Sequence, residues 1–364
     1  MSSSSSVTPI ILWCVPRSVS TATERAFMTR PDTRVWHEPL GDPFYFSSKR
    51  QCLRYTEDEA KKSEHWEKDI VDVMQSLLDP EVANKGSGKD AEVEYIFIKD
   101  MAQYIMPAET LKNIHPGSRV YHTPGQAGIK AHGINPDGEV LENPTVIPTE
   151  LMRRFKHTFL VRTPQKAVPS YWKCVQEKAA GFEYFDGAEA GFEELRLLYK
   201  WISNPNSTFN KAPAETSAQF SGAIQTQPHP PPLVDASVLL AHPTETIKHL
   251  CDSTGVPFAP SMLSWESGPQ AEFQKWGTYH KGAENSTGFK AETPIDRQAK
   301  KAAKKAEMDK SAATTGASSQ SEVELRKEDR FPQEVKDTIT RNMEPYNWLY
   351  ARRTIKGADK GSSA

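Results

Sequence analysis

The sequence predicts an α/β fold in which helices cover both faces of a central, mostly parallel sheet of about five strands. Five short apolar, β-rich runs support this prediction: Ile10–Val15, Arg34–His37, Tyr95–Ile98, Thr158–Val161 and Leu233–Ala236. Helix-like stretches lie between several of them, and short continuous apolar strands separated by helices are typical of parallel sheets buried on both faces. Ligands bind beyond the carboxyl ends of such strands, so the residues after each strand are candidates for a site.

The composition limits the classes of partner. The chain has 364 residues, enough for one large domain or two small ones. Hydrophobic residues make up 37% and charged residues 25%, which fits an apolar core with a wet surface. The formal net charge of −2 provides no field that would favour a polyanion or an acidic membrane. Neither nucleic acid nor a membrane is therefore expected as a partner.

Cysteine usage and the N-terminal segment indicate a location. Cys14, Cys52, Cys174 and Cys251 form no C-x-x-C pair, and no histidine and cysteine spacing resembles a zinc site. Scattered cysteines in a long chain fit a reducing compartment. The first residues lack a basic region, and no run approaches the roughly 20 apolar residues that cross a bilayer. We expect a cytoplasmic protein with no metal, and the sequence does not indicate whether it forms a homo-oligomer.

Changes in composition divide the chain into one α/β domain, residues 9–290, with inserts and tails. Pro-, Ser- and Gly-rich segments cannot bury much apolar surface, so we expect them to be flexible. They are a disordered N-terminus at 1–8, three inserts at 84–92, 115–149 and 203–232, and a low-complexity segment at 291–330. The last segment, 331–364, carries apolar residues that indicate a final helix docked on the core, followed by a tail.

The loop after the first strand is a candidate anion site. The strand runs into Pro16-Arg17-Ser18, and Ser20 and Thr21 stand where a helix should begin. Free N–H groups at a helix N-terminus bind phosphate-like anions, and Arg17 adds a forked positive charge. The alternative is an ordinary strand-to-helix turn with Ser20 as the N-cap. The loop is not a Walker A motif, because G-x-x-x-x-G-K-[ST] occurs nowhere in the chain.

The fourth strand ends in a second candidate. Arg162 follows the strand, Pro164 fits the start of a helix, and Ser170 lies two turns along it. Arg162 and Ser170 could therefore face one anion at the edge of the sheet. The alternative is that Arg162 pairs with a nearby acid and Ser170 is merely exposed.

Together these motifs resemble the sulfotransferase family. Pro16-Arg-Ser-x-Ser-Thr looks like its 5′-phosphosulfate loop, and Arg162-x-Pro with Ser170-Tyr171 looks like its 3′-phosphate motif. The chain is more closely similar to a sulfotransferase-like branch of P-loop proteins, some of which are named after branched-chain aminotransferases. The resemblance implies a three-layer P-loop NTPase-like fold and sulfuryl transfer from 3′-phosphoadenylyl sulfate to a small-molecule hydroxyl or amine.

The resemblance also implies a role for individual residues. Arg17, Ser18, Ser20, Thr21 and Ala22 would wrap the 5′-phosphosulfate of the donor. The 3′-phosphate would be held by Arg162 and Ser170. The sequence departs from the family at two places. Val19 stands where the loop usually has glycine, and Lys281-Gly282 is the only substitute for a late Arg-Lys-Gly loop.

Sulfuryl transfer needs a base and a positive charge near the bridging oxygen. Glu38 follows the second strand, where several sulfotransferase branches have a catalytic glutamate, and it is the first candidate for the base. Asp100, after the third strand, is the second candidate, and Lys99 is the candidate charge stabiliser. Strand alternation should point the neighbouring His37 to the opposite face. The alternative for Glu38 is a helix or loop cap, and the alternative for Lys99 and Asp100 is a solvated strand end.

Two alternative functions and the role of one aromatic cluster stay open at this point. An NTP-dependent kinase or hydrolase would need the missing P-loop lysine. A catalytically inactive nucleotide-binding protein would be consistent with Val19 and with Met101, which replaces the histidine of a Lys-x-His pattern. Trp265, Trp276, His280 and Phe289 would either line an acceptor pocket or pack under a long loop.

Overall fold

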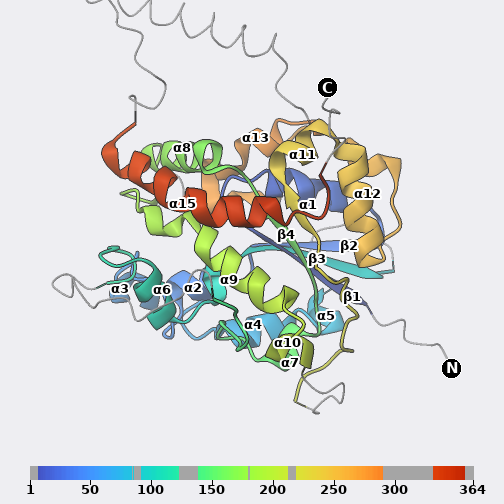
Figure 1. Cartoon of the computed structure of the whole chain (residues 1–364), viewed down its shortest axis with the longest axis horizontal. Helices are drawn as coiled ribbons and strands as arrows, with labels where there is room; N and C mark the ends of the chain where they lie inside the picture. The colour runs from blue at the N-terminus through green and yellow to red at the C-terminus, as the bar shows by residue number, and fades with distance from the viewer. Residues whose placement is uncertain are drawn as a thin grey trace, which may run out of the picture.

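The computed structural model describes residues 7–83, 85, 92–122, 138–178, 181–211, 219–289 and 331–356. Within them, five strands form one all-parallel sheet in the order β2-β3-β1-β4-β5, which confirms the predicted fold class (Figure 1). The strands are Thr8–Cys14, Thr33–His37, Tyr95–Met101, Lys156–Val161 and Leu233–Asp235, numbered β1 to β5 along the chain. The predicted segment 291–330 lies outside the described residues, as do residues 1–6 and, within the three predicted inserts, residues 84, 86–91, 123–137 and 212–218.

Helices and short 3-10 turns connect the strands. The α-helices before β4 are α1 (Ser20–Met28), α2 (Gly41–Phe46), α3 (Glu57–Lys61), α4 (Ile70–Ser76), α5 (Pro80–Ala83), α6 (Ala108–Ile114) and α7 (Thr149–Met152). Those after β4 are α8 (Pro164–Gln176), α9 (Phe192–Ser203), α10 (Thr208–Lys211), α11 (Ala236–Ala241), α12 (Pro243–Thr254), α13 (Lys281–Glu284) and α15 (Gln333–Ala351). The 3-10 turns are η1 (Ala102–Ile105), η3 (Gly187–Ala190), η4 (Pro260–Leu263) and η5 (Ala271–His280).

Both faces of the sheet are covered, which explains why its strands are apolar without alternation. In the sheet register Phe97 lies level with Ile10 and Phe159 with Trp13, so the two phenylalanines point to opposite faces. On one face Phe27 of α1 stacks on Phe97 at 3.9 Å between ring centroids. On the other, Tyr199 of α9 contacts Phe159 edge-on at 5.0 Å.

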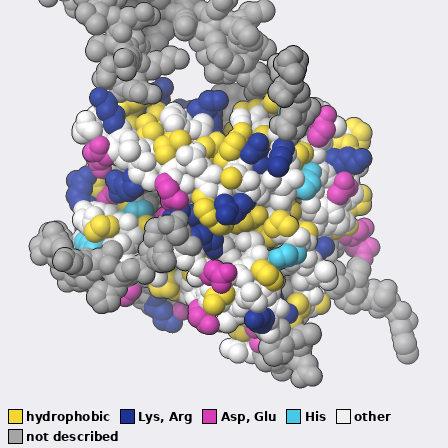
Figure 2. Space-filling view, viewed as in Figure 1, with side chains coloured by type: hydrophobic (Ala, Val, Ile, Leu, Met, Phe, Trp, Pro, Cys, Tyr) yellow, Lys and Arg dark blue, Asp and Glu magenta, His cyan; other side chains and the backbone are white. Residues whose placement is uncertain are grey.

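The final helix, α15, packs against α8, α9 and β4 (Figure 1). Its Leu349 is fully buried, and the Tyr346 hydroxyl donates to the carboxylate of Asp235 at 3.2 Å. Among the described residues, no helix combines the length and apolar character that crossing a membrane requires. Acidic and basic side chains are interspersed over the face seen in Figure 2, as the small net charge leads one to expect.

One buried histidine in this core makes stability depend on pH. The Trp13 indole N–H donates to Nδ1 of His157 at 2.8 Å, and Nε2 of His157 donates to the Met152 carbonyl at 2.8 Å. The ring is therefore neutral, and burial lowers the pKa of His157 to about 4. An unfolded histidine has a pKa near 6.5, so between those values the unfolded state binds a proton that the folded state does not.

We therefore expect the free energy of unfolding to fall as the pH falls through this window, with up to about 3 kcal/mol from His157. Urea unfolding at about pH 7 and about pH 5 would measure it. The variant His157→Gln keeps a donor and an acceptor but does not titrate, so its stability should change less between the two conditions. An equal change in both proteins would contradict this assignment.

Candidate active site

A cavity of about 1330 Å³ opens at the carboxyl ends of the strands. It collects the following predicted site residues in its lining: Arg17, Ser20, Thr21, Ala22, Glu38, Lys99, Arg162 and Ser170. They come from the ends of β1, β2, β3 and β4 and the helices that follow β1 and β4. Parallel strands end at the same edge of a sheet, which is why segments far apart in the sequence meet here.

Three predicted site residues are not part of this lining. Ser18 is fully buried. Asp100 is also buried, and its two carboxylate oxygens accept from the backbone N–H groups of Leu40 and Met101, each at 2.9 Å. Burial raises the pKa of Asp100 to about 7. The Asp100 carboxyl thus connects the turn after β2 to the end of β3. The third residue, Lys281, is exposed at the start of α13.

The loop after β1 turns sharply into α1. Val19 is the N-cap and has φ 72° and ψ 13°, a left-handed conformation, and no side chain caps the helix. Ser20 is therefore the first helical residue and not the cap. The first N–H groups of α1 are left without a capping side chain at the cavity wall, as an anion site requires. Left-handed backbone is costly for a β-branched residue, and Arg17 with φ 63° is also in this region.

The two predicted phosphate motifs contact one another. Nε of Arg17 donates to the Ser170 hydroxyl at 3.0 Å, and Nη1 of Arg162 donates to the Arg17 carbonyl at 2.8 Å. A second nitrogen of Arg17 donates to the carbonyl of Tyr279. Both arginines thus converge on one end of the cavity, where they can bind the same nucleotide anion.

Lys99 and Glu38 form a buried ion pair beside this loop. Their side chains are 2% and 3% exposed, and Nζ of Lys99 donates to Oε1 of Glu38. Burial acts to raise the pKa of Glu38, but Lys99, His37 and Lys275 together outweigh it and bring that pKa below its usual value. Burial acts to lower the pKa of Lys99, and Glu38 reverses that effect. Both groups are therefore charged, and Glu38 in this state is a weak base.

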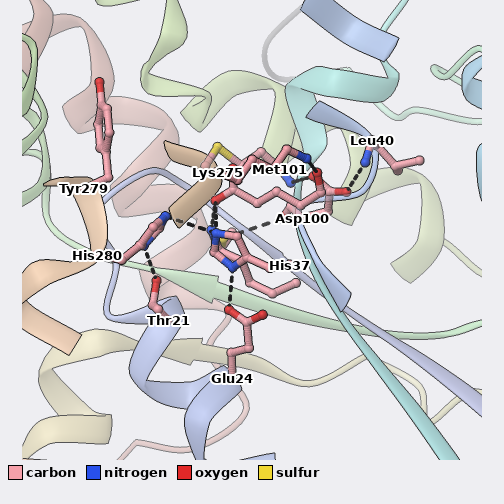
Figure 3. A network of polar contacts seen from close by, with 12 residues as sticks. Thr21, Glu24, His37, Leu40, Asp100, Met101, Lys275, Tyr279 and His280 are labelled. Carbon is pink, nitrogen blue, oxygen red and sulfur yellow. Dashed lines mark hydrogen bonds and ion pairs between the residues drawn. The ribbon is translucent and has the colours of Figure 1, made fainter. Parts of the chain in front are cut away.

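A chain of polar contacts next to the pair involves residues that the sequence did not single out as catalytic. Glu24 on α1 and His37 at the end of β2 are in contact, and His37 in turn meets His280 at the end of η5 (Figure 3). The expectation that His37 would point away from the site is wrong. Nε2 of His37 lies 3.7 Å from Oε1 of Glu38. Strand alternation stops at His37, because Glu38 has a left-handed φ of 48°.

Residues 229–315 match the model of a family described as "Sulfotransferase domain". The predicted sulfotransferase resemblance is confirmed. Branched-chain-amino-acid aminotransferase-like protein 1 of Arabidopsis thaliana is 26% identical over 278 residues, which are 76% of this chain and 36% of that protein. Branched-chain-amino-acid aminotransferase-like protein 2 of the same plant is 30% identical over 144 residues, which are 39% of this chain and 20% of that protein. The chain thus matches about a third or less of each relative's length.

One solved structure with a similar chain path is titled "Sulfotransferase Domain from the Curacin Biosynthetic Pathway". It is 14% identical, the match covers 78% of this chain and 84% of that one, and the TM-score is 0.33.

Another part of the cavity lining is aromatic. The lining includes Met101 and the rings of Tyr45, Tyr104, Tyr171, Phe182, Trp276 and Tyr279. Three of the four aromatic residues left open by the sequence, Trp276, His280 and Phe289, lie in the lining. Trp265 instead packs edge-on against Phe289 at 5.2 Å and under the Arg25 guanidinium. The lining thus has a polar part at the β1 loop and an aromatic part, beside small and polar residues such as Ser237, Asn285 and Ser286.

Proposed function

We propose that this chain transfers a sulfuryl group from 3′-phosphoadenylyl sulfate to a hydroxyl or amine of a small molecule. The observation that carries the proposal is the junction of the two phosphate motifs, in which Arg17 contacts Ser170 and Arg162 contacts Arg17. In this assignment Arg17, the Ser20 hydroxyl and the backbone N–H groups of Ser20 and Thr21 at the N-terminus of α1 bind the 5′-phosphosulfate. The 3′-phosphate is bound by Arg162 and Ser170.

In the proposed reaction, the acceptor atom forms a bond to sulfur while the bond from sulfur to the bridging oxygen breaks. The leaving oxygen gains negative charge as the bond breaks. Lys99 supplies the compensating charge in a site with little water, where such stabilisation is strong. Glu38 holds the Lys99 ammonium in place through their ion pair. No metal is required for these steps, because Arg17, Arg162 and Lys99 supply the positive charge.

The aromatic part of the cavity supports a small, largely apolar acceptor, since aromatic walls suit such ligands. We also propose a cytoplasmic location, which is supported by the four cysteines, all free and buried. Neither nucleic acid nor membrane is part of the proposed function.

Binding of 3′-phosphoadenosine 5′-phosphate, the desulfated donor, tests the proposal directly. We expect a dissociation constant in the micromolar range, about −8 kcal/mol, by titration calorimetry. Arg17→Ala and Arg162→Ala should each weaken binding by roughly 10- to 100-fold, the usual loss for one charge-assisted hydrogen bond. The exposed Lys173, on the same helix as Ser170, provides a matched control, and Lys173→Ala should bind normally.

A preference for ATP with Mg²⁺ over the desulfated donor would overturn the proposal in favour of a kinase or hydrolase. Equal losses in Lys173→Ala and the two arginine variants would show that only the net charge matters. Thermal unfolding of each variant separates a lost contact from a lost fold.

A further inference from the structure

We propose that Thr21, His280, His37 and Glu24 form a proton relay that takes the proton from the acceptor hydroxyl during transfer. This inference rests on the proposed function, because it needs an acceptor that loses a proton. It replaces Glu38 as the base with a chain of groups that leads away from the cavity into the core.

The relay is continuous from the cavity wall to a fully buried carboxylate. The Thr21 hydroxyl lies 3.0 Å from Nδ1 of His280, and Nε2 of His280 lies 3.0 Å from Nε2 of His37. Nδ1 of His37 then lies 2.8 Å from Oε2 of Glu24. Thr21 and His280 line the cavity, whereas Glu24 is 0% exposed. Figure 3 shows His280 between Thr21 and His37, with Glu24 at the far end.

Protons can be assigned to this chain in two complete ways. Burial lowers the pKa of His37 to about 3 and that of His280 well below its usual value, so each ring carries one proton. In the first assignment every donor points inward, from Thr21 through both rings to an ionised Glu24. In the second every donor points outward, and Glu24 is the neutral acid. The first assignment becomes the second when each proton moves across one hydrogen bond toward Glu24.

Glu24 is suited to be the end of the relay. Burial raises its pKa well above the usual range, with further contributions from nearby charges. Its second oxygen, Oε1, has no hydrogen-bond partner among the described residues. A buried carboxylate with one oxygen unpaired is costly as an anion, so it accepts a proton readily, whereas the nearby Lys99 ammonium opposes burial and favours the ionised form in which the step begins. The charged groups that face the relay from neighbouring elements are Arg17, Glu38, Lys99, Glu272 and Lys275.

The proposed step balances in atoms and charge. The acceptor O–H bond breaks as the O–S bond forms, and the bridging S–O bond breaks to leave an anionic oxygen on the nucleotide beside Lys99. The acceptor proton passes to Thr21, the Thr21 proton to His280, the Nε2 proton of His280 to His37, and the Nδ1 proton of His37 to Glu24. After the products leave, the proton returns to water by the reverse route.

A divalent metal is the competing use of the two histidines. Ligand atoms of His37, Glu38 and His280 all lie within 4.8 Å of one another. Each ring also has its other nitrogen held by Glu24 or Thr21, as metal-bound histidines do. The Lys99 ammonium already binds the same oxygen of Glu38 that would face the ion, and it would repel a cation. The relay is therefore the better account of the geometry.

Nitrogen-15 NMR of labelled histidines tests the relay without turnover. The relay requires one ring proton on each of His37 and His280 near neutral pH. A doubly protonated ring at either position would overturn it. Purified protein that contains one equivalent of a transition metal would also overturn the relay, if removal of the metal by a chelator shifts the same signals.

Kinetics with two acceptors of similar shape test the proton transfer itself. Phenol must lose its proton during transfer, whereas 4-nitrophenol is largely ionised in mildly alkaline buffer. We expect Glu24→Gln to lower the turnover of phenol by about 100-fold, the usual contribution of a general base, and that of 4-nitrophenol by less than about threefold. The rate with phenol in this variant should rise steadily with pH, as the ionised acceptor becomes available.

The controls separate failure of the relay from failure of the proposed function. Glu245→Gln removes an exposed carboxylate on α12 that is not among the charges acting on the relay, so it should leave the two acceptors in their wild-type ratio. Affinity for 3′-phosphoadenosine 5′-phosphate should stay within about twofold in Glu24→Gln. Equal losses for both acceptors would overturn the relay and make Glu24 a structural residue. A wild-type protein that does not bind this nucleotide would overturn the proposed function.

If Glu24→Gln fails to fold, the cavity end of the relay provides the same test. Thr21→Ser keeps the hydroxyl and should keep the wild-type ratio of the two acceptors, whereas Thr21→Val removes it and should lose phenol turnover selectively. Identical behaviour of these two variants would count against the relay.

Discussion

Lys99→Met is expected to lower turnover by about 10²- to 10³-fold and to destabilise the fold by about 3–5 kcal/mol. The two losses have different causes. Turnover falls because the leaving oxygen loses the positive charge beside it. Stability falls because Glu38, 3% exposed, is left as a buried carboxylate without its partner. Methionine fills much of the same volume, so loss of packing contributes little.

A second substitution separates the two effects. Lys99→Met combined with Glu38→Gln removes both charges of the pair, so it should recover most of the stability but none of the turnover. Urea unfolding and initial rates would measure the two quantities on the same proteins. The exposed pair of Lys112 and Glu109, at 3.0 Å, gives the matched control, and Lys112→Met should cost less than about 1 kcal/mol. Normal turnover in Lys99→Met would make the pair purely structural.

The strands could be predicted because buried parallel strands are continuous apolar runs. Each of the five predicted runs overlaps a strand of the sheet. The errors are at the ends, where hydrophobicity carries no signal. The fifth run was predicted to reach Ala236, but β5 ends at Asp235 because that side chain accepts from the Ser237 N–H at 2.8 Å and caps α11. The first run missed Thr8, which pairs with Tyr95 in the sheet although it is polar.

The site could be predicted in part for the same geometric reason. Arg17, Glu38 and Arg162 each follow a strand, Lys99 lies near the carboxyl end of β3, and the shared edge of a parallel sheet brings them to one cavity. His280 follows no strand and is 243 residues from its partner His37, so its place depends on how η5 folds over the sheet. Glu24 lies within α1, and its only local signal is its position one turn after Thr21 on the helix that begins at the anion loop.

A second buried ion pair stabilises the aromatic part of the cavity. The two carboxylate oxygens of Glu189 accept from Nε and Nη2 of Arg54, and each side chain is 2% exposed. The hydroxyls of Tyr45 and Tyr171 also donate to this carboxylate. Arg54 lies over the ring of Phe182 at 4.1 Å. A planar cation thus joins the carboxylate to the aromatic wall, which lysine could not do as well.

We expect Arg54→Ala to destabilise the fold by about 3–5 kcal/mol, because it leaves Glu189 buried without its counter-ion. Arg54→Lys should recover only part of the loss, since an ammonium makes neither the bidentate contact nor the stacking. Arg54→Met with Glu189→Leu should be more stable than Arg54→Ala, because no charge is left unpaired. Urea unfolding would rank the three, and equal stability of the single and double variants would contradict the assignment.

The same variants show whether the two parts of the cavity act separately. Arg54 makes its contacts with Glu189 and the surrounding rings, whereas the nucleotide is proposed to contact Arg17, Arg162 and the start of α1. The folded double variant should therefore bind 3′-phosphoadenosine 5′-phosphate within about twofold of the wild type while its Michaelis constant for an aromatic acceptor rises. Parallel losses in both quantities would mean that the Glu189 pair positions the nucleotide loop as well, because Tyr171, whose hydroxyl donates to Glu189, is next in the chain to Ser170 on α8.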